Sequence, residues 1–301
     1  MGTLVDDVGK NLDSARGLGK IDAPGTRAGK ITHRVVANGC NPDVDAPTVQ
    51  RYLRDDHGIE TAGGLDHALT QLDGIRHADE LSSSEQAALA ARLSRSSDSS
   101  AVRAFVDDLD SPEDVRHLLD EDTAAVDRMA KFYAHRGANS GQYRNIDPDL
   151  SSNDILQVGE KADIHGTNLI VKRDGELRWI EQGNSDFGWR HIEQRHIQGV
   201  GKDAVSEDGV TSFWPIGQRI ETRSLPNKMN PNEINDLIYK TIKDGETSGG
   251  RAIGKTEYML RPVPQEGIKR MRVVIRRDGS VETAFPEAGN DIAKWNDGWV
   301  K

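Results

Sequence analysis

The chain has 301 residues, 35% of them hydrophobic and 5% aromatic, which suits two ordinary domains with modest cores. No run approaches the ~18 consecutive apolar residues of a membrane-spanning helix, so no transmembrane segment is expected, and no classical signal peptide opens the sequence. The single cysteine, Cys40, excludes an internal disulfide and every zinc site built from several cysteines.

The net charge of −10 is concentrated in the first half of the chain. Residues 1–150 carry 17 Lys and Arg against 26 Asp and Glu, whereas residues 151–301 carry 22 against 23. The second half also contains a dense basic stretch at residues 269–277. This asymmetry hints at a polyanionic ligand for the second half, although most charge runs are solvated faces.

The first part of the chain is predicted to be helical after a loop-like start. Residues 1–47 are rich in Gly, Pro, Asp and Asn and lack apolar periodicity, so they are expected to be loop-like. Residues 48–136 form a small helical region, with Ser84 predicted to cap one helix and Ser111-Pro112 to open another. Helical spacing of apolar residues indicates short helices near 48–56, 65–72, 85–95, 102–109, 112–119 and 123–135.

The second part has a different texture. Residues 137–152 are polar and turn-rich and are predicted to be a linker to a domain at 153–301. That domain is predicted to contain two hairpin turns, each with an Asp-Gly pair, helices at 187–197 and 232–242, and strands at 169–180, 251–260, 271–275 and 281–286. The expected fold class is therefore α+β, an antiparallel sheet packed with two or three helices and preceded by a mostly helical region.

The most informative run is residues 188–196, which holds two histidines and two arginines behind an apolar anchor. At 100° per residue, Trp189, Ile192 and His196 share one helix face, while His191 and Arg195 share a neighbouring one. Two histidines five positions apart point ~140° apart on an ideal helix, so a shared metal is not expected. The zinc-protease, zinc-deaminase and serine-hydrolase motifs are all absent from the sequence.

Acid–base cleavage of RNA without a metal or other cofactor fits these residue types. The 2′-hydroxyl of RNA attacks the adjacent phosphorus once it is deprotonated, and the 5′-oxygen then leaves with a proton. Histidine is suited to both proton transfers near neutral pH. The phosphorane gains negative charge, which a nearby Lys or Arg would stabilise.

The run from Phe187 to His196 resembles the signature helix of toxin nucleases in the phage barnase–EndoU–colicin–RelE-like superfamily. Residues 254–258, the strand at 271–275 and residues 279–286 are similar to the end of such domains. The resemblance covers about half the chain. It implies a sheet on which a basic residue and a small hydroxyl residue face the helix.

Carried over residue by residue, the resemblance implies His191 and His196 as acid–base groups, with His196 preferred of the two, and Lys255 and Thr283 as further catalytic residues. The substrate would be held by four further side chains, which are Arg195, Tyr258, Arg251 and Trp189. Arg251 or Arg261 is an alternative to Lys255, because the sequence alone does not fix the register of the strands. His165 lies outside the matched helix and is kept as a reserve histidine.

Each of these residues also has a structural alternative. The alternative for His196 is a packed histidine with a satisfied hydrogen bond, and the alternative for Arg195 is a surface ion-pair partner. Lys255 and Thr283 are ordinary strand residues, and Tyr258 and Trp189 are types often found in cores. Only their joint pattern favours a site.

The resemblance implies a metal-independent endoribonuclease toxin whose expected target is tRNA, cut to a 2′,3′-cyclic phosphate. It also implies delivery into the cytoplasm of a competing cell and a cognate immunity protein. Three alternatives stay open. They are a catalytically inactive module that binds RNA or protein, a protein associated with phage particles, and a DNA-cleaving nuclease.

Overall fold

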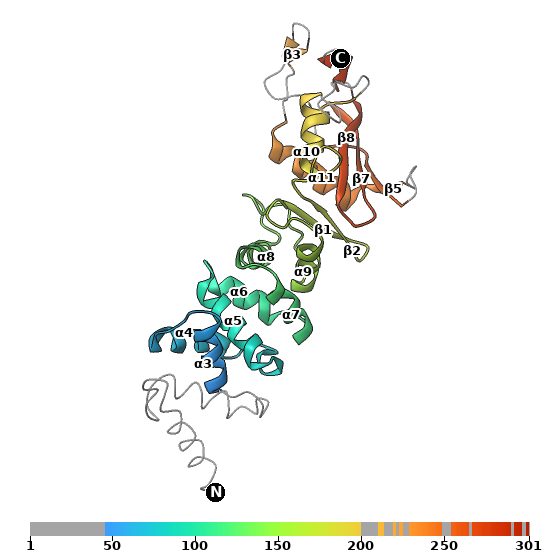
Figure 1. Ribbon diagram of the computed structural model, residues 1–301. Helices are drawn as coiled ribbons and strands as arrows, with labels where there is room; N and C mark the ends of the chain where they lie inside the picture. The colour runs from blue at the N-terminus through green and yellow to red at the C-terminus, as the bar shows by residue number, and fades with distance from the viewer. Residues whose placement is uncertain are drawn as a thin grey trace, which may run out of the picture. The chain divides into compact units, whose positions relative to one another are not determined.

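The computed structural model describes residues 46–199, 210–213, 219–220, 223–224, 229–248, 254–264, 267–289, 292–296 and 299–300. Most of the segment expected to be loop-like, residues 1–45, therefore lies outside the described residues, and so does Arg251. The chain divides into two compact units, Met1–Ala134 and His135–Lys301. The first is helical where it is described and the second combines helices with antiparallel strands, so the fold is of the α+β class (Figure 1).

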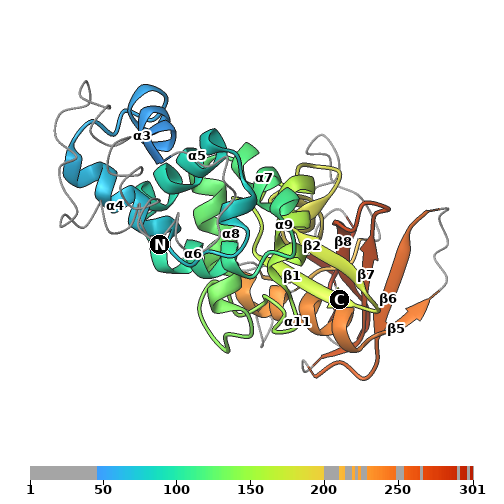
Figure 2. The ribbon, with the colours of Figure 1, turned by 90° about the horizontal axis from the view of Figure 1, so that it is seen from below.

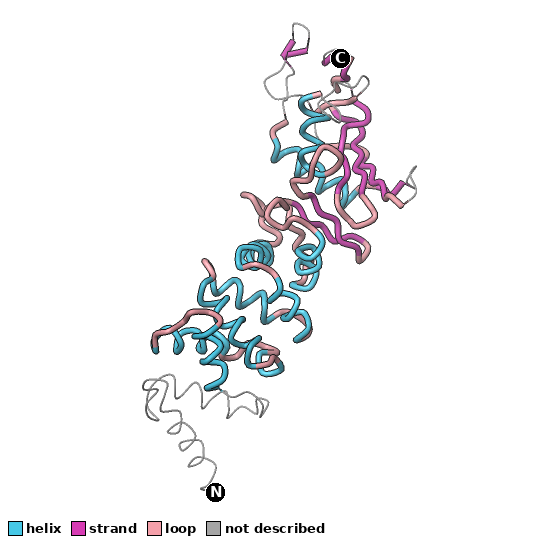
Figure 3. The backbone as a smooth tube through the Cα atoms, in the orientation of Figure 1, coloured by secondary structure: helices cyan, strands magenta, loops and turns pink. Residues whose placement is uncertain are grey.

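The first unit is an assembly of short helices, drawn in cyan in Figure 3. α5 (Ser83–Arg95) is in contact with four of the others, and its Leu89, Ala90 and Leu93 are fully buried. The remaining helices are α3 (Ala46–Asp55), α4 (Ala62–Leu72), η1 (Ala78–Glu80), α6 (Ser99–Asp107), α7 (Pro112–Asp120) and α8 (Thr123–His135). In the described part of the chain, no helix has both the length and the apolar character to cross a membrane.

Capping residues explain where these helices begin. Ser82 accepts a hydrogen bond from the Glu85 amide, and the Glu85 carboxylate accepts one from the Ser82 amide. This reciprocal pair needs a spacing of three residues, so the cap is Ser82 and the predicted cap at Ser84 is wrong. Ser111 caps α7 with Pro112 in its first turn, as predicted.

The second unit is built around a four-stranded antiparallel sheet in the order β5-β6-β7-β8. Its strands are β5 (Glu246–Ser248), β6 (Thr256–Leu260), β7 (Ile268–Ile275) and β8 (Val281–Gly289). A hairpin of β1 (Leu169–Arg173) and β2 (Glu176–Ile180) adjoins it through a bridge between Trp179 and Ser280. Two small ladders complete the strands, β3 (Arg219–Ile220) with β4 (Arg223–Ser224), and β9 (Lys294–Trp295) with β10 (Trp299–Val300).

The two faces of the four-stranded sheet bear different side chains. α11 (Pro231–Asp244) lies against β6 and β7 and also against β1, as the view in Figure 2 shows. The face that it covers bears the paired core residues Tyr258, Val273 and Ala284. Because side chains alternate along a strand, the opposite face bears their neighbours Glu257, Val274 and Thr283.

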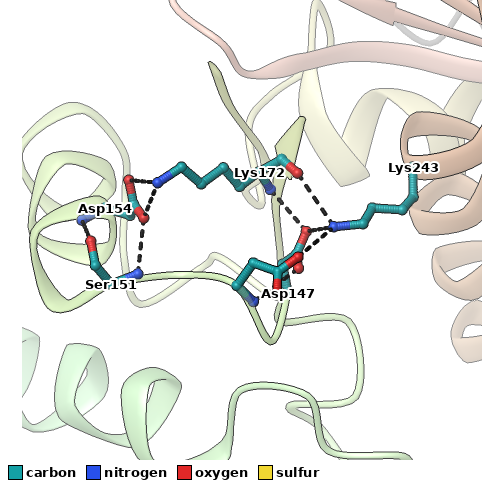
Figure 4. Close-up of polar contacts among 6 residues, drawn as sticks. Asp147, Ser151, Asp154, Lys172 and Lys243 are labelled. Atoms are coloured by element: carbon teal, nitrogen blue, oxygen red, sulfur yellow. Dashed lines mark hydrogen bonds and ion pairs between the residues drawn. The ribbon is translucent and has the colours of Figure 1, made fainter. Parts of the chain in front are cut away.

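Residues 137–151 belong to the second unit, which differs from the linker expected at 137–152. Ile146 bridges to Ile170 of β1, and Asp147 is fully buried. Lys243 Nζ donates to Asp147 Oδ2 at 2.6 Å, and the Lys172 amide donates to the same oxygen at 3.1 Å (Figure 4). These bonds attach the segment to β1 and α11. Asp147, one of its polar residues, is buried and hydrogen-bonded within the unit, so the segment is not a flexible linker.

A further helix, α9 (Ser152–Lys161), follows this segment where no helix was predicted. Ser151 accepts from the Asp154 amide, and the Asp154 carboxylate accepts from the Ser151 amide (Figure 4). Asp154 also pairs with Lys172 Nζ at 2.7 Å, which lowers the pKa of Asp154 against the opposing effect of its burial. The capping pair was missed because it uses Asp at a position where Glu is the usual signal.

Candidate functional site

The helix predicted at residues 187–197 forms as two consecutive pieces. α10 (Gly188–Glu193) is α-helical, and η2 (Gln194–Gln198) is a π-helix. α10 is in contact with β8 (Figure 1), and its Trp189 and Ile192 pack into the core of the unit. π-Helical turns are rare and occur frequently at functional sites.

The π-helix brings His196 into contact with β8. His196 Nε2 is 3.1 Å from Thr283 Oγ1, and its ring stacks on Phe285 with centroids 5.2 Å apart. On the other side, His196 Nδ1 is 2.8 Å from the carbonyl oxygen of Thr211. A carbonyl oxygen only accepts, so Nδ1 carries the hydrogen and Nε2 accepts from the Thr283 hydroxyl. Two residues expected in one site, His196 and Thr283, are thus in direct contact.

His196 is a neutral imidazole at ordinary pH. Its exposed fraction is 4%, and burial lowers the pKa of His196 from 6.5 to about 3. The hydrogen bond to Thr211 opposes this shift, while the charges of His191 and Arg195 add to it. A group with so low a pKa does not hold the proton that a general acid must donate near neutrality. Burial and the low pKa therefore argue against His196 as the general acid, and its ring instead accepts a hydrogen bond from the Thr283 hydroxyl.

His191 is the first histidine of the motif and is half-buried. Its ring centroid lies 6.3 Å from that of His196, nearer than opposite sides of an ideal helix would suggest, because the wider π-turn rotates His196 back toward it. His191 Nδ1 is 2.7 Å from the carbonyl oxygen of Ser185, so Nδ1 carries the hydrogen and Nε2 is the basic nitrogen.

A tight loop before α10 holds that carbonyl in place. The Asn184 amide donates to the Phe187 carbonyl at 3.0 Å, and the Trp189 amide donates to the Glu181 carbonyl at 2.9 Å. Gly188 has φ +79°, and a Cβ at this position would lie 2.7 Å from the Glu181 carbonyl oxygen. Only glycine closes this loop, which explains the Phe-Gly pair at the start of the motif.

Lys255 pairs with the residue that precedes Thr283 on β8. Its Nζ is 2.6 Å from Glu282 Oε2. Val274 pairs with Thr283 and Ile275 pairs with Val281, so Glu282 is the extra residue of a β-bulge. The bulge lets Glu282 stand beside Thr283, and an ion pair thus connects the expected cation with the expected hydroxyl strand.

Tyr258 and Trp189 lie in the core and not at this site. Tyr258 is 3% exposed on the face covered by α11, where its hydroxyl accepts from Arg178 Nε at 3.3 Å and the Arg173 guanidinium covers its ring. Trp189 is buried in the same hydrophobic core. Neither ring presents a surface for base stacking, because each is enclosed by its neighbours.

The remaining expected residues are spread more widely. Arg195 is half-buried in η2, directly before His196. His165 is exposed on the turn between α9 and β1, so it belongs to a different segment from α10 and the sheet. Arg261, an alternative to Lys255, follows β6 at the opposite end and contacts Met259 Sδ at 2.7 Å. Arg251 lies outside the described residues.

A cleft of about 830 Å³ adjoins the Lys255–Glu282 pair. The Arg276 guanidinium lies 4.3 Å above the ring centre of Phe187. The cleft is lined by Asn184, Asp186, Phe187, Gly254, Lys255, Arg276, Arg277, Asp278 and Glu282. Sequence reasoning singled out Arg276 and Arg277 only as part of a basic stretch and missed Glu282 entirely. For the two arginines, the available signal was their position on the turn after β7, where functional residues concentrate.

Within the ranges that the structure describes, no group of three or more His, Cys, Asp or Glu side chains is arranged to hold a metal ion. Comparison of the sequence with models of protein families gives no match, and comparison with curated proteins gives none.

Proposed function

We propose that the second unit is a metal-independent endoribonuclease of the barnase–EndoU–colicin–RelE-like toxin class. Its expected target is tRNA, and its expected setting is delivery into a competing cell, with an immunity protein as the partner that protects the producer. The observation that carries the proposal is the contact of His196 with Thr283, which joins the motif helix to β8. It is supported by the nearness of the His191 and His196 rings and by the pairing of Lys255 with Glu282, the residue before Thr283.

In this proposal His191 is the general base. Its Nε2 takes the proton of the 2′-hydroxyl, and the 2′-oxygen forms a bond to the adjacent phosphorus. The bond from phosphorus to the 5′-oxygen breaks, and that oxygen takes a proton from the Lys255 ammonium. Solvent then removes the proton from His191 and restores that of Lys255, leaving a 2′,3′-cyclic phosphate and a 5′-hydroxyl.

The neighbouring groups position these two. Lys255 also offsets the negative charge that develops on the phosphorane oxygens, and Glu282 holds its ammonium in place. Thr283 is held by His196, so its oxygen keeps lone pairs that accept from a sugar hydroxyl. His196 acts through Thr283 and is a positioning residue.

The test is incubation of the purified full chain with total RNA in EDTA, followed by mapping of the new ends. The expected products carry 2′,3′-cyclic phosphate and 5′-hydroxyl ends, and an RNA with 2′-deoxyribose at the cut position stays intact. Cleavage of the deoxy substrate, or loss of cleavage in EDTA, would instead identify a DNA-cleaving or metal-dependent nuclease.

One observation favours a second candidate, an inactive module that binds RNA or protein. The Thr283 hydroxyl is already bonded to a buried histidine, an arrangement that packing alone would also produce. This candidate predicts RNA binding without cleavage under every condition of the same experiment.

A further inference from the structure

His191 and His196 are held by the same kind of hydrogen-bond arrangement. His191 Nδ1 faces the carbonyl oxygen of Ser185 at 2.7 Å, and His196 Nδ1 faces a carbonyl oxygen in the same way at 2.8 Å. Each carbonyl belongs to a planar peptide group, whose other polar group is the amide of the next residue. The orientation of each ring therefore depends on how that next amide is held.

At His196 the peptide group is held by the main chain. The peptide that joins Thr211 to Ser212 presents its carbonyl to the histidine. The amide of the same peptide donates to the Ala293 carbonyl at 2.9 Å. Ser212 and Phe213 are both buried, so packing also restrains this peptide. No substitution of a side chain removes the amide bond directly, because both of its groups belong to the backbone.

At His191 the same role falls to a side chain. The peptide that joins Ser185 to Asp186 presents its carbonyl to His191. The amide of this peptide donates to Asn184 Oδ1 at 2.8 Å. Because an amide N–H is a donor, the side-chain atom of Asn184 that faces it is the oxygen. The Asn184 side chain, the peptide and the imidazole thus form one chain of hydrogen bonds, in which each bond polarises the next.

The rest of the loop is fixed on either side of this peptide. The Asn184 amide donates to the Phe187 carbonyl at 3.0 Å, and a Cβ on Gly183 would overlap that carbonyl. Between these points, Ser185 is half-buried and Asp186 is exposed, so little packing restrains the peptide that joins them. The bond to Asn184 Oδ1 is therefore a restraint on this peptide that a single substitution removes.

The state of His191 follows from the orientation of this peptide. With the Ser185 carbonyl in place, the hydrogen of the neutral ring lies on Nδ1 and the lone pair lies on Nε2. If the peptide rotates, the carbonyl turns away from the ring and the hydrogen is free to move to Nε2. The ring then presents a donor at the nitrogen that the proposed reaction uses as an acceptor.

We propose that Asn184 is a positioning residue of the candidate site, and that it fixes the tautomer and orientation of His191 through the Ser185–Asp186 peptide. The inference rests on the proposed function, in which His191 Nε2 is the general base. It deepens that function by naming the residue on which the state of the base depends.

The experiment is nitrogen NMR of the full chain, isotopically labelled in its histidines, at about pH 8, where unperturbed histidines are neutral. His191→Gln identifies the His191 signals. The natural chain is expected to show a protonated Nδ1 and an unprotonated Nε2 at His191. Asn184→Leu removes the acceptor at similar size and is expected to shift His191 toward the opposite tautomer. Asn184→Asp keeps an acceptor oxygen and is expected to retain the natural tautomer.

Rates of RNA cleavage separate positioning from substrate binding. Asn184→Leu is expected to lower kcat about tenfold, the effect of losing one hydrogen bond to the imidazolium that forms in the reaction. KM is expected to stay within about twofold, because the substituted oxygen faces the protein backbone. Asn232→Leu changes an exposed asparagine of α11 and is the matched control, with rate and tautomer expected to match those of the natural chain.

The tautomer and the rate test different claims. An unprotonated Nδ1 at His191 in the natural chain, or an unchanged tautomer in Asn184→Leu, would overturn the inference whatever the rate of cleavage. A shift in Asn184→Asp as large as that in Asn184→Leu would also overturn it, because the acceptor oxygen would then not be the cause. The expected tautomers in a chain that never cleaves RNA would contradict the proposed function alone.

Discussion

The two units of the chain bury very different kinds of side chain. In the described part of the first unit, the polar residues in the buried class are two glutamines, Gln50 and Gln86, and none is charged. The second unit buries ionisable groups on several elements, and they are Asp147, Asp154, Arg178, His196, Glu257 and Arg272. Both units have dense apolar cores, so packing alone does not explain the difference.

This contrast indicates which unit tolerates an unfavourable burial of ionisable groups that folding alone does not require. Burying an ionisable group is unfavourable unless partners compensate it, and a purely structural domain avoids it. The first unit follows that rule, and its charged side chains form helix caps and surface ion pairs. The second breaks it around α10 and β8 and around Asp147, which makes the second unit the place to look for function.

The largest expected effect on stability comes from Asp147. Asp147→Asn leaves the Lys243 ammonium and the Lys172 amide facing an uncharged amide, so unfolding of the second unit should become easier by about 3 kcal/mol. Asp55→Asn, an exposed carboxylate on α3, should change stability by less than about 0.5 kcal/mol. Urea denaturation of both variants checks this, and equal effects would remove the contrast between the units.

The next effect is a pH dependence that originates at His196. Its pKa falls from 6.5 to about 3 on folding, so the unfolded chain binds the proton more tightly. Stability is therefore highest above pH 6.5 and decreases as the pH falls, by about 1.4 kcal/mol per unit and about 2 kcal/mol by pH 5.

His196→Gln should abolish most of this decrease when unfolding is followed between pH 7 and pH 5. His57 of the first unit is the matched comparison. Burial also lowers the pKa of His57, but this side chain is only partly buried. His57→Gln should remove a smaller part of the slope. A slope unchanged in His196→Gln would show that the ring is not a buried neutral imidazole.

The smallest effects should be equal in the two units. Ser82→Ala removes the cap of α5, and Asn230→Ala removes that of α11, which has the same reciprocal bond with Glu233. Each should lower the free energy of unfolding by about 1 kcal/mol, because caps act locally. Thermal denaturation checks this. A much larger loss of stability in Asn230→Ala than in Ser82→Ala would contradict the expectation that both caps act only locally.

Much of the fold could be predicted because its signals are local. Apolar spacing at 3.6 residues and the Ser111-Pro112 signal located the helices of the first unit, and the Asp-Gly pair located the β1–β2 hairpin. α9 and residues 137–151 were missed for a physical reason. Their polar residues are satisfied by Lys172 and Lys243, which lie far away in the sequence, so the segment imitates a linker.

The candidate site was predictable in part. The pairing of His196 with Thr283 followed from the motif helix and the last long strand, but burial of His196 did not, because it depends on a π-turn and on the Thr211 carbonyl. The position of Tyr258 on the opposite face of the sheet could not be predicted. Which face a strand residue occupies depends on where β6 begins, and the sequence does not give that point. Glu282 was invisible because its bulge is a property of the β7–β8 pairing.

The most direct test of the account is the rate of cleavage of one RNA oligonucleotide in EDTA by His191→Gln and by His67→Gln. His67 is an exposed histidine of the first unit and serves as the matched control. If His191 is the general base, His191→Gln lowers the rate by about 10²–10⁴-fold with unchanged thermal stability, while His67→Gln cleaves like the natural chain. Equal rates for the two variants would contradict it.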